Sequence, residues 1–348
     1  MTKNWTSPNY SRKRVRRAGE SLRSKNSDEG TLRESLDVLG NWRLSHAYPM
    51  HAMLMFLRSR ALKIDTEATT AQRLKRLASI TSKLDRFQSM GLDRMQDIGG
   101  CRVILANQRY ADSLKKSILS SRTRHVLHKQ NDYVSEPKLS GYRGYHLIFK
   151  YAGTKSEYTG LFVEAQIRTR NQHAWATAVE IVGTFIGKSL KTGEGHEMWD
   201  EFFRLMGIEI AAYDGAGYPD NYNKDDSKRS LRKLIDELNV RAVLPALSAT
   251  TNELEGYEKK NSKSAYYLMV LDTSSGGPQA HIRIWVFAKN YMEEAALEYA
   301  KLEQVHREDS RLDVVLVAVD SVNSLRRAYP NYFADTKAFM ELVDFADQ

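Results

Sequence analysis

The sequence predicts an α/β (α+β) fold in which a motif-rich central region is flanked by a helical N-terminal extension and a small C-terminal α/β unit. Apolar residues recur at helical spacing as far as about residue 66. Helical and strand-like segments then alternate over residues 67–214 and again over 228–348. The polar, turn-rich stretch GAGYPDNYNKDDS separates these two regions and predicts a linker over residues 215–227.

Each element follows from apolar periodicity and from the turn residues around it. In the N-terminal extension, helical spacing is shown by Leu32, Leu36, Leu39 and Trp42 and again by Met50, Met53, Leu54 and Leu57. In the central region we predict helices over 70–87, 110–120, 171–185 and 198–213, and strands over 101–105, 146–151 and 160–168. In the C-terminal unit we predict helices over 228–247, 290–306 and 321–327, and strands over 265–271, 281–288 and 312–319. The glycine-rich stretch 272–277 opens no helix, so we interpret it as a hairpin turn and not as a phosphate loop.

Composition narrows the class of protein. The 348 residues are 27% charged and 42% hydrophobic, which is typical of a soluble globular protein. No run approaches the roughly 18–20 apolar residues of a membrane span, and the N-terminus lacks the apolar core of a signal peptide. A single cysteine, Cys101, excludes an internal disulfide framework and fits a cytoplasmic location. The net charge of +9 favours anionic ligands, although a solvated basic surface would give the same value.

Two strand-like segments each carry a carboxylate. Asp97 belongs to the stretch DIGGCRV, beside two glycines and Arg102. In the stretch VEAQIRT, the side chains of Glu164, Gln166 and Arg168 point to one face of a strand because side chains alternate. Carboxylates on neighbouring strands with arginines alongside suit a Mg²⁺ ion that holds a polyphosphate. The pair therefore predicts the start of a phosphoryl-transfer site.

Two further stretches carry polar groups that suit a nucleotide. In QRLKRLASITSKL, residues Lys75, Ser79 and Lys83 recur every four residues and would form one cationic helix face, with Arg73 leading in. An ordinary amphipathic helix with a solvated basic face is the alternative. In DYVSEPKLSGYRGYH, Lys138 and Tyr142 combine a charge with a flat ring, which suits a nucleotide base and its phosphates. A tyrosine-rich loop packed on the core is the alternative.

The order of these blocks resembles the synthetase domain of the RelA/SpoT family over roughly residues 67–185. The blocks are R-x-K-x-x-x-S-x-x-x-K, D-I-G-G-x-R-V, D-Y-V-x-x-P-K-x-x-G-Y-x-x-x-H and V-E-x-Q-I-R-T, followed by a helix with His173. The resemblance implies a nucleotidyltransferase-like mixed sheet, mainly five-stranded, with the nucleotides lying across one face. It also implies transfer of the β,γ-pyrophosphate of ATP to a ribose 3′-hydroxyl, with release of AMP.

The resemblance implies a role for each motif residue. Arg73 and Arg102 would sandwich the adenine of ATP, and the donor phosphates would contact Lys75, Ser79 and Lys83. Asp97 and Glu164 would hold Mg²⁺, and Glu164 would also be the base for the attacking hydroxyl. Gln166 and Arg168 would orient Glu164. Tyr142 would stack on the acceptor base, and Lys138 and His146 would contact acceptor or donor phosphates. For His173 itself, we favour a structural hydrogen bond at the rim of the sheet over a metal site.

Two departures from the family pattern concern the acceptor and the hydrolase. The alarmone-making members of the family usually carry G-Y-Q-S where this chain has Gly141-Tyr142-Arg143-Gly144. The change would place a cation in the acceptor pocket and puts a guanosine nucleotide as acceptor in doubt. The histidine helix also differs from that of the long bifunctional members. The chain contains no adjacent His-Asp pair, so we expect no hydrolase half.

Three functions fit this sequence. The one we favour is a (p)ppGpp synthetase that acts on GDP or GTP. The second is a toxic relative that modifies the 3′ end of tRNA, for which Arg143 and the basic run at residues 12–17 would suit a longer anionic acceptor. A partly disordered tail would explain the basic run equally well. The third is a non-catalytic nucleotide-binding module, which the retained carboxylates and arginines argue against. The C-terminal unit carries no chemical motif and could be regulatory, self-neutralising, or a surface for an antitoxin or another protein. The sequence defines no oligomeric interface.

Overall fold

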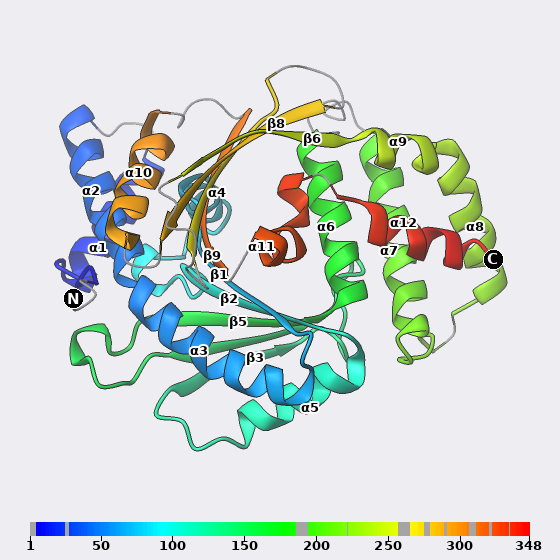
Figure 1. The fold of residues 1–348 in the computed structure, drawn as a ribbon, viewed down its shortest axis with the longest axis horizontal. Helices are drawn as coiled ribbons and strands as arrows, with labels where there is room; N and C mark the ends of the chain where they lie inside the picture. Colours follow the sequence, from blue (N-terminus) through cyan, green and yellow to red (C-terminus); the bar gives the residue numbers. More distant parts are fainter. Residues whose placement is uncertain are drawn as a thin grey trace.

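The computed structural model describes residues 5–24, 28–185, 194–220, 222–256, 265–274, 279–288, 291–305, 311–319, 322–333 and 335–348. One mixed sheet of nine strands organises these residues, in the order β3-β4-β5-β2-β1-β9-β7-β8-β6 (Figure 1). The strands are β1 (Thr69–Leu74), β2 (Gly99–Leu105), β3 (Val126–Asp132), β4 (Tyr145–Lys150), β5 (Phe162–Thr169), β6 (Ser248–Gly256), β7 (Ala265–Asp272), β8 (Gln279–Ala288) and β9 (Leu312–Val319). The pairs β2–β5 and β6–β8 are parallel and the other pairs are antiparallel. The predicted α/β class is confirmed.

The sheet has two halves of different sequence origin. The motif region supplies the five adjacent strands β3, β4, β5, β2 and β1, as the resemblance implies. The strands of the C-terminal unit form as predicted, but they continue this sheet and do not build a separate one. The connection is the antiparallel pairing of β1 with β9, in which Gln72 lies opposite Ala318 and Arg73 opposite Val317. The C-terminal residues are therefore part of the same layer as the motifs.

Helices cover both faces of the sheet. The helices are α1 (Arg12–Arg23), α2 (Glu29–Ser45), α3 (Ala47–Ile64), α4 (Leu77–Arg86), α5 (Gln108–Leu119), α6 (Arg170–Phe185), α7 (Glu194–Tyr213), α8 (Lys224–Glu237), α9 (Val240–Ala246), α10 (Met292–Val305), α11 (Val322–Ala328) and α12 (Lys337–Ala346). Short 3-10 turns occupy Leu92–Arg94, Ser156–Tyr158 and Pro330–Phe333. Helices α3 and α5 pack on one face of the motif half through apolar side chains such as Leu57 and Leu114. Helix α11 lies on the opposite face, between the sheet and α6 (Figure 1).

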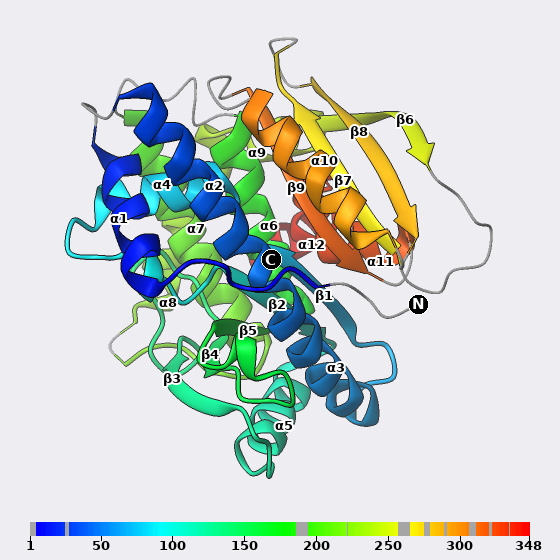
Figure 2. The ribbon, with the colours of Figure 1, turned by 90° about the vertical axis from the view of Figure 1, so that its left-hand side faces the viewer.

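Two further layers complete the fold. Helices α6, α7, α8, α9 and α12 share an apolar cluster that includes Phe202, Trp199 and Phe339. Helix α10 packs along the C-terminal strands through Ala295 and Tyr299 (Figure 2). The faces of the central sheet are thus buried by segments from the beginning, the middle and the end of the chain.

The N-terminal helices are capped and tied to the motif region. Ser11 and Asp28 accept hydrogen bonds from the backbone at the starts of α1 and α2, which satisfies amides that lack helical partners. Arg12 donates to the carbonyl of Gly160 at 3.0 Å, and Arg16 pairs with Asp93 at 2.9 Å. Part of the basic run is therefore used inside the protein. The helical extension predicted for residues 1–66 is confirmed over its described residues.

Several predicted boundaries are wrong. The helix predicted over 70–87 is a strand, β1, followed by the shorter helix α4, because β1 is inserted between β2 and β9 and pairing outweighs the helical propensity of its residues. The helix predicted over 228–247 divides into α8 and α9 at Asn239, whose φ of 47° is left-handed. The predicted linker contains the first turn of α8. The predictions for residues 275–277, 290, 306 and 321 lie outside the described residues.

Polar edge strands and end segments were missed. Strand β3 is largely exposed and its sequence, VLHKQND, lacks a clear alternation. Strand β6 and helix α12 also have no counterpart in the prediction. Among the described residues, no helix is long and apolar enough to cross a membrane.

Candidate active site

The sheet register places the polar motif residues on one face. Gly100 of β2 lies opposite Glu164 of β5, and Arg102 lies opposite Gln166. His146 of β4 lies on the other side of Gln166. Strand β1 completes the row, with Arg73 opposite Gly100. The alternation predicted for β5 therefore extends across four strands and gathers donors and acceptors from distant motifs.

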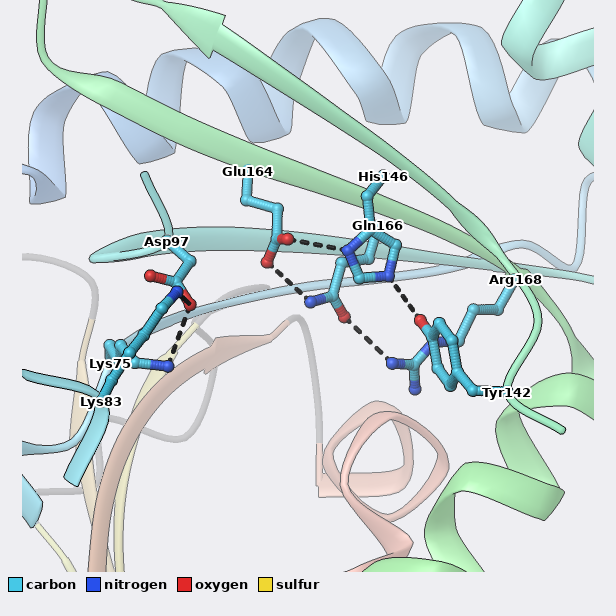
Figure 3. A network of polar contacts seen from close by, with 8 residues as sticks. All are labelled: Lys75, Lys83, Asp97, Tyr142, His146, Glu164, Gln166 and Arg168. Carbon is cyan, nitrogen blue, oxygen red and sulfur yellow. Dashed lines mark hydrogen bonds and ion pairs between the residues drawn. The ribbon is translucent and has the colours of Figure 1, made fainter. Parts of the chain in front are cut away.

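Asp97 lies two residues before β2, not within the strand, and is held by two lysines. Its Oδ2 accepts from Nζ of Lys75 at 3.0 Å and from Nζ of Lys83 at 2.9 Å (Figure 3). Lys75 lies in the turn between β1 and α4, where its amide bonds to the carbonyl of Ile98 at 2.8 Å. The two lysines were predicted on one helix face, and they do converge. The reason is different, because only Lys83 is helical.

Glu164 begins a chain of hydrogen bonds that crosses the sheet. Its Oε1 accepts from Nδ1 of His146 at 2.8 Å, and its Oε2 accepts from the amide of Gln166 at 2.7 Å. The Gln166 carbonyl oxygen accepts from Arg168 at 3.3 Å. Arg168 also donates to the hydroxyl of Tyr142 at 3.1 Å, and that hydroxyl bonds Nε2 of His146 (Figure 3). The chain closes on itself and fixes all five side chains.

The environment of Glu164 favours its charged form. Burial alone would raise the pKa of the carboxyl group. The hydrogen bond and charge of His146, the Gln166 amide and the charge of Lys75 outweigh burial and lower the pKa to about 2. A carboxylate of such low basicity is a poor proton acceptor near neutral pH. It is well suited to binding a cation.

The loop predicted to hold the acceptor base packs around Tyr142. Nζ of Lys138 lies 4.5 Å from the ring centroid of Tyr133 and 5.0 Å from that of Tyr142. Burial lowers the pKa of Lys138. The loop bends at Gly141, whose φ is +87°, and an added Cβ there would lie 3.1 Å from the backbone of Arg204 on α7. Tyr142 is therefore positioned by α7 as well as by its own loop.

The guanidinium of Arg143 binds the loop backbone in this conformation and is not presented to an anionic ligand. Its guanidinium donates to the carbonyl of Val134 at 2.9 Å and is partly buried. Burial lowers the pKa of this group. Arg143, the residue that departs from the G-Y-Q-S pattern, thus supports the backbone of the loop. The geometry gives no support to the expectation that it places a cation in the acceptor pocket.

A pocket lies between the two carboxylates and the two arginines proposed for the donor base. It encloses about 440 Å³ of empty space, part of it open to solvent, and is lined by Arg73, Lys75, Asp97, Gly100, Cys101, Arg102, Glu164, Gln166 and Tyr329. The sequence motifs predicted all of the polar residues in this set except Tyr329. We call this space the donor pocket.

Tyr329 reaches the donor pocket from the C-terminal unit. The guanidinium carbon of Arg102 lies 5.4 Å from the Tyr329 ring centroid, and Arg102 donates to the carbonyl of Ala328 at 2.9 Å. Burial lowers the pKa of Arg102 to about 10, and the nearby Arg168 adds to this effect. Arg102 is charged at neutral pH and already has an aromatic partner. Sequence reasoning missed Tyr329 because it lies 227 positions after Arg102 and outside every motif.

The carboxylates fit a divalent cation that is also bound by a substrate. Asp97 Oδ1 is buried and has no hydrogen-bond partner among the described residues, whereas Oδ2 has two. Glu164 lines the same pocket and is charged. The described residues contain no group of three or more potential metal ligands. Mg²⁺ commonly takes one or two carboxylates plus substrate phosphates, so this donor set suits it.

Two other predicted residues have simple positions. Ser79 is partly buried on the first turn of α4, between the two lysines in sequence. His173 is buried on α6, and its Nε2 donates to the carbonyl of Arg327 at 3.0 Å. The prediction of a structural hydrogen bond for His173 is confirmed.

Comparison with known proteins agrees with the motif order. Residues 72–181 match the family model described as "Region found in RelA / SpoT proteins". Residues 72–181 are a RelA/SpoT region. GTP pyrophosphokinase YjbM of Bacillus subtilis is 39% identical over 110 residues, which cover 30% of this chain and 51% of that protein. The GTP pyrophosphokinase of Escherichia coli K12 is 26% identical over 137 residues, which cover 39% of this chain and 17% of that protein.

The RelA/SpoT region contains every predicted site residue. Among solved structures, small alarmone synthetase 1 of B. subtilis bound to its product pppGpp is 28% identical, covering 49% of this chain and 89% of that chain, with a TM-score of 0.40. The chain spans about half the length of YjbM. Tyr329 and the C-terminal strands lie outside the matched region, although they complete its sheet and its pocket.

Proposed function

We propose that this chain is an ATP-dependent pyrophosphokinase that transfers the β,γ-pyrophosphate of ATP to the 3′-hydroxyl of GDP or GTP, making (p)ppGpp and AMP. The observation that carries the proposal is the convergence of Asp97, with its two lysines, and Glu164 on one pocket lined by Arg73 and Arg102. Relatives named GTP pyrophosphokinase support it. A non-catalytic module would have no need to place both carboxylates around the same space.

The reaction forms a bond from the acceptor 3′-oxygen to the β-phosphorus of ATP and breaks the bond between that phosphorus and the α–β bridging oxygen. AMP leaves with that oxygen, and the hydroxyl proton is lost to a base. Negative oxygens crowd one small volume, so positioning and charge neutralisation supply most of the catalysis. The ammonium groups of Lys75 and Lys83 lie where they could leave the Asp97 carboxylate and bind the donor phosphates instead. Arg73 and Arg102 flank the space for the donor base.

Asp97 and Glu164 would hold Mg²⁺ together with the donor phosphates. When bound, the ion would neutralise phosphate charge and make the phosphorus more electrophilic. The low pKa of Glu164 fits this role better than that of the base. Within the closed hydrogen-bond chain, Gln166 and His146 keep the Glu164 oxygens oriented. The proton of the attacking hydroxyl would then be accepted by a group of higher basicity or by solvent.

The geometry favours a mononucleotide acceptor over the 3′ end of tRNA. Arg143 is bonded to Val134, and Arg12 and Arg16 are bonded to Gly160 and Asp93. They are three of the six basic residues, Arg143 and the five in the run at residues 12–17, that would have supported an RNA acceptor. Tyr142 and Lys138 remain beside Glu164 through the Arg168 and His146 hydrogen bonds and suit a base with its phosphates.

The test is transfer of label from ATP carrying a radioactive γ-phosphate. Purified protein, Mg²⁺ and labelled ATP are incubated separately with GDP, GTP and bulk tRNA. Label in a product of GDP or GTP that is lost in the Asp97→Asn variant supports the proposal. Label in tRNA alone would replace the proposed acceptor. Absence of transfer from a protein that binds ATP would refute the activity under these conditions.

The C-terminal unit would limit access of ATP to the donor pocket. Tyr329 lies against Arg102, where the resemblance places the adenine ring, and only 2% of its surface is exposed. ATP would have to displace this ring or share the pocket with it. This interpretation gives the C-terminal unit the regulatory role considered from the sequence.

Substitution of Tyr329 separates the two alternatives. If the ring obstructs ATP, Tyr329→Ala should increase ATP affinity at least tenfold, whereas Tyr329→Phe should retain the natural affinity. If the ring is a wall of the adenine site, Tyr329→Ala should weaken binding and exclude obstruction. The loss of a buried aromatic ring costs about 3–5 kcal/mol, so thermal unfolding of both variants must first show a folded protein.

A further inference from the structure

A second pocket on the same sheet face has no part in the proposed reaction. It encloses about 1210 Å³ of empty space, part of it open to solvent, between α6, the end of β2 and the chain from α11 to α12. Its apolar lining includes Ile104 of β2, Ala174 of α6 and Phe339 of α12. Small-molecule sites commonly have such a concave and mainly apolar form. We call it the α6–α12 pocket.

Cations of three separate elements line this pocket. They are Arg170 at the start of α6, Arg326 and Arg327 of α11, and Lys337 at the start of α12. Glu67, Asp335 and Glu341 also line it, so cations exceed carboxylates by one. Over the described part of the chain, Arg170, Arg327 and Lys337 form no ion pair. Their charges are available to an anion.

His173 gives the pocket a buried polar group with an unused atom. The side chain lines the pocket and is 6% exposed. Because Nε2 donates to the Arg327 carbonyl, the neutral ring presents Nδ1 as an acceptor. That Nδ1 is buried and has no hydrogen-bond partner among the described residues. A buried acceptor without a partner is costly, so a shift of the ring that opened Nδ1 to the pocket would let it accept from an amino or hydroxyl group of a ligand.

We propose that the α6–α12 pocket binds a nucleotide, with its base against Ile104, Ala174 and Phe339 and its phosphates on Arg170, Arg327 and Lys337. The base supplies a flat surface for the apolar wall. The phosphates supply the negative charge that would balance these three cations. This site is separate from the donor pocket and does not depend on the proposed activity.

The segment between the two pockets gives such a ligand a route to the donor site. On β2, Arg102 lines the donor pocket and Ile104, two residues later on the same face, lines the α6–α12 pocket. On the C-terminal side, Tyr329 lines the first pocket, whereas Arg327 and Pro330 line the second. A nucleotide in the α6–α12 pocket would therefore contact the residues on either side of Tyr329 and bias the position of that ring.

The test is calorimetric titration of the full chain with ADP, GDP and inorganic pyrophosphate. The comparison includes the double variant Arg170→Glu/Arg327→Glu, a donor-pocket variant, Lys75→Ala, and a matched control, Lys116→Glu, on the exposed side of α5. Thermal unfolding checks that each protein is folded. We expect ADP or GDP to bind the natural chain and to bind the double variant at least tenfold more weakly. In Lys75→Ala and Lys116→Glu, the affinity of the α6–α12 pocket should be unchanged.

Hydrogen exchange then locates the bound nucleotide. The nucleotide that binds should slow exchange over residues 322–333 and 335–341 in the Lys75→Ala protein. Pyrophosphate should bind more weakly, because it makes no contact with the apolar wall. The proposal is overturned if no nucleotide binds at a concentration of about 1 mM, which is on the order of the Kd of a weak effector. It is also overturned if the affinity falls in Lys75→Ala but not in the double variant, or if pyrophosphate binds as tightly as the nucleotides.

Discussion

Protonation of His46 tests how the N-terminal helices support the loop that carries Asp97. The imidazole is 1% exposed, and its Nδ1 donates to the Trp42 carbonyl at 2.7 Å. It packs against the first residue of β2, since a Cβ added to Gly99 would lie 3.3 Å from the His46 Cβ. Burial lowers the pKa of His46 to about 4, the bond to Trp42 opposes this shift, and the charge of Arg12 adds to it. Protonation of His46 would therefore destabilise the helices behind the loop that carries Asp97.

The sign and size of the effect follow from this pKa. The unfolded chain binds the His46 proton more readily, with a pKa near 6.5, so the stability contributed by the neutral ring is present above pH 6.5 and is lost as the pH falls towards 4. Each pH unit in that range costs about 1.4 kcal/mol, which gives about 2 kcal/mol at pH 5. Most carboxylates are still charged at pH 5, but burial also lowers the pKa values of His173 and His125, so the contribution of His46 has to be isolated by substitution.

Urea unfolding at pH 7.5 and pH 5 measures this loss. The stability difference between the natural protein and His46→Asn should shrink by about 2 kcal/mol on acidification, because asparagine does not titrate. The matched control is His128→Asn, the same substitution at an exposed position of β3. A His46→Asn difference that is the same at both pH values would refute the reasoning.

Two further substitutions test the site directly. Asp97→Asn should lower label transfer about a thousandfold or more while leaving the fold intact, because it removes the partner of Lys75 and Lys83 and a proposed cation ligand. Asp85→Asn, on the exposed side of α4, is its control. Equal losses of transfer in both variants would contradict the assignment. Gly207→Ala should destabilise the protein by about 1–3 kcal/mol and weaken acceptor binding, because the new Cβ would lie 2.6 Å from the Gly141 carbonyl oxygen beneath Tyr142. Gly183→Ala, in open space on α6, should instead stabilise by about 0.5–1 kcal/mol, and urea unfolding that ranks the two variants the other way would exclude this contact as the cause.

The parts of the site that sequence could predict are those encoded within one strand. The alternation of Glu164, Gln166 and Arg168 fixes their common face regardless of which strand lies beside them. The apolar pattern of β2 similarly predicts a buried strand after Asp97. These local patterns survived because parallel pairing of β2 and β5 buries both strands on the face away from the site.

The parts that failed depend on pairing between distant segments. Arg73 was assigned to a helix because nothing near it in sequence reveals β9, its strand partner more than 200 positions later. The two lysines were predicted to meet through helical spacing, but they meet because the turn after β1 bonds to Ile98. Tyr329 enters the donor pocket for the same non-local reason. Contacts of this kind follow from the completed sheet and not from any local pattern.

The donor half of the site therefore depends on β9, α10 and α11 of the C-terminal unit in a way that the acceptor half does not. Glu303 of α10 accepts from the amide of Leu77 at the start of α4 and pairs with Arg43 of α2. Asp313 of β9 pairs with Arg76. These two carboxylates hold Arg76 and Leu77, the adjacent residues that lead from Lys75 into α4. Glu303 also satisfies the positive end of that helix.

The acceptor loop is fixed by Gly141 against α7 and by hydrogen bonds within the RelA/SpoT region. A displacement of β9, α10 and α11 would thus move the donor contacts at Arg102 and α4, whereas Tyr142 would stay with α7, which packs with α12 in a separate apolar cluster. Control of activity through β9, α10 and α11 should change the affinity for ATP and leave the affinity for the acceptor almost unaltered. That separation follows from which strands and helices hold each half of the site.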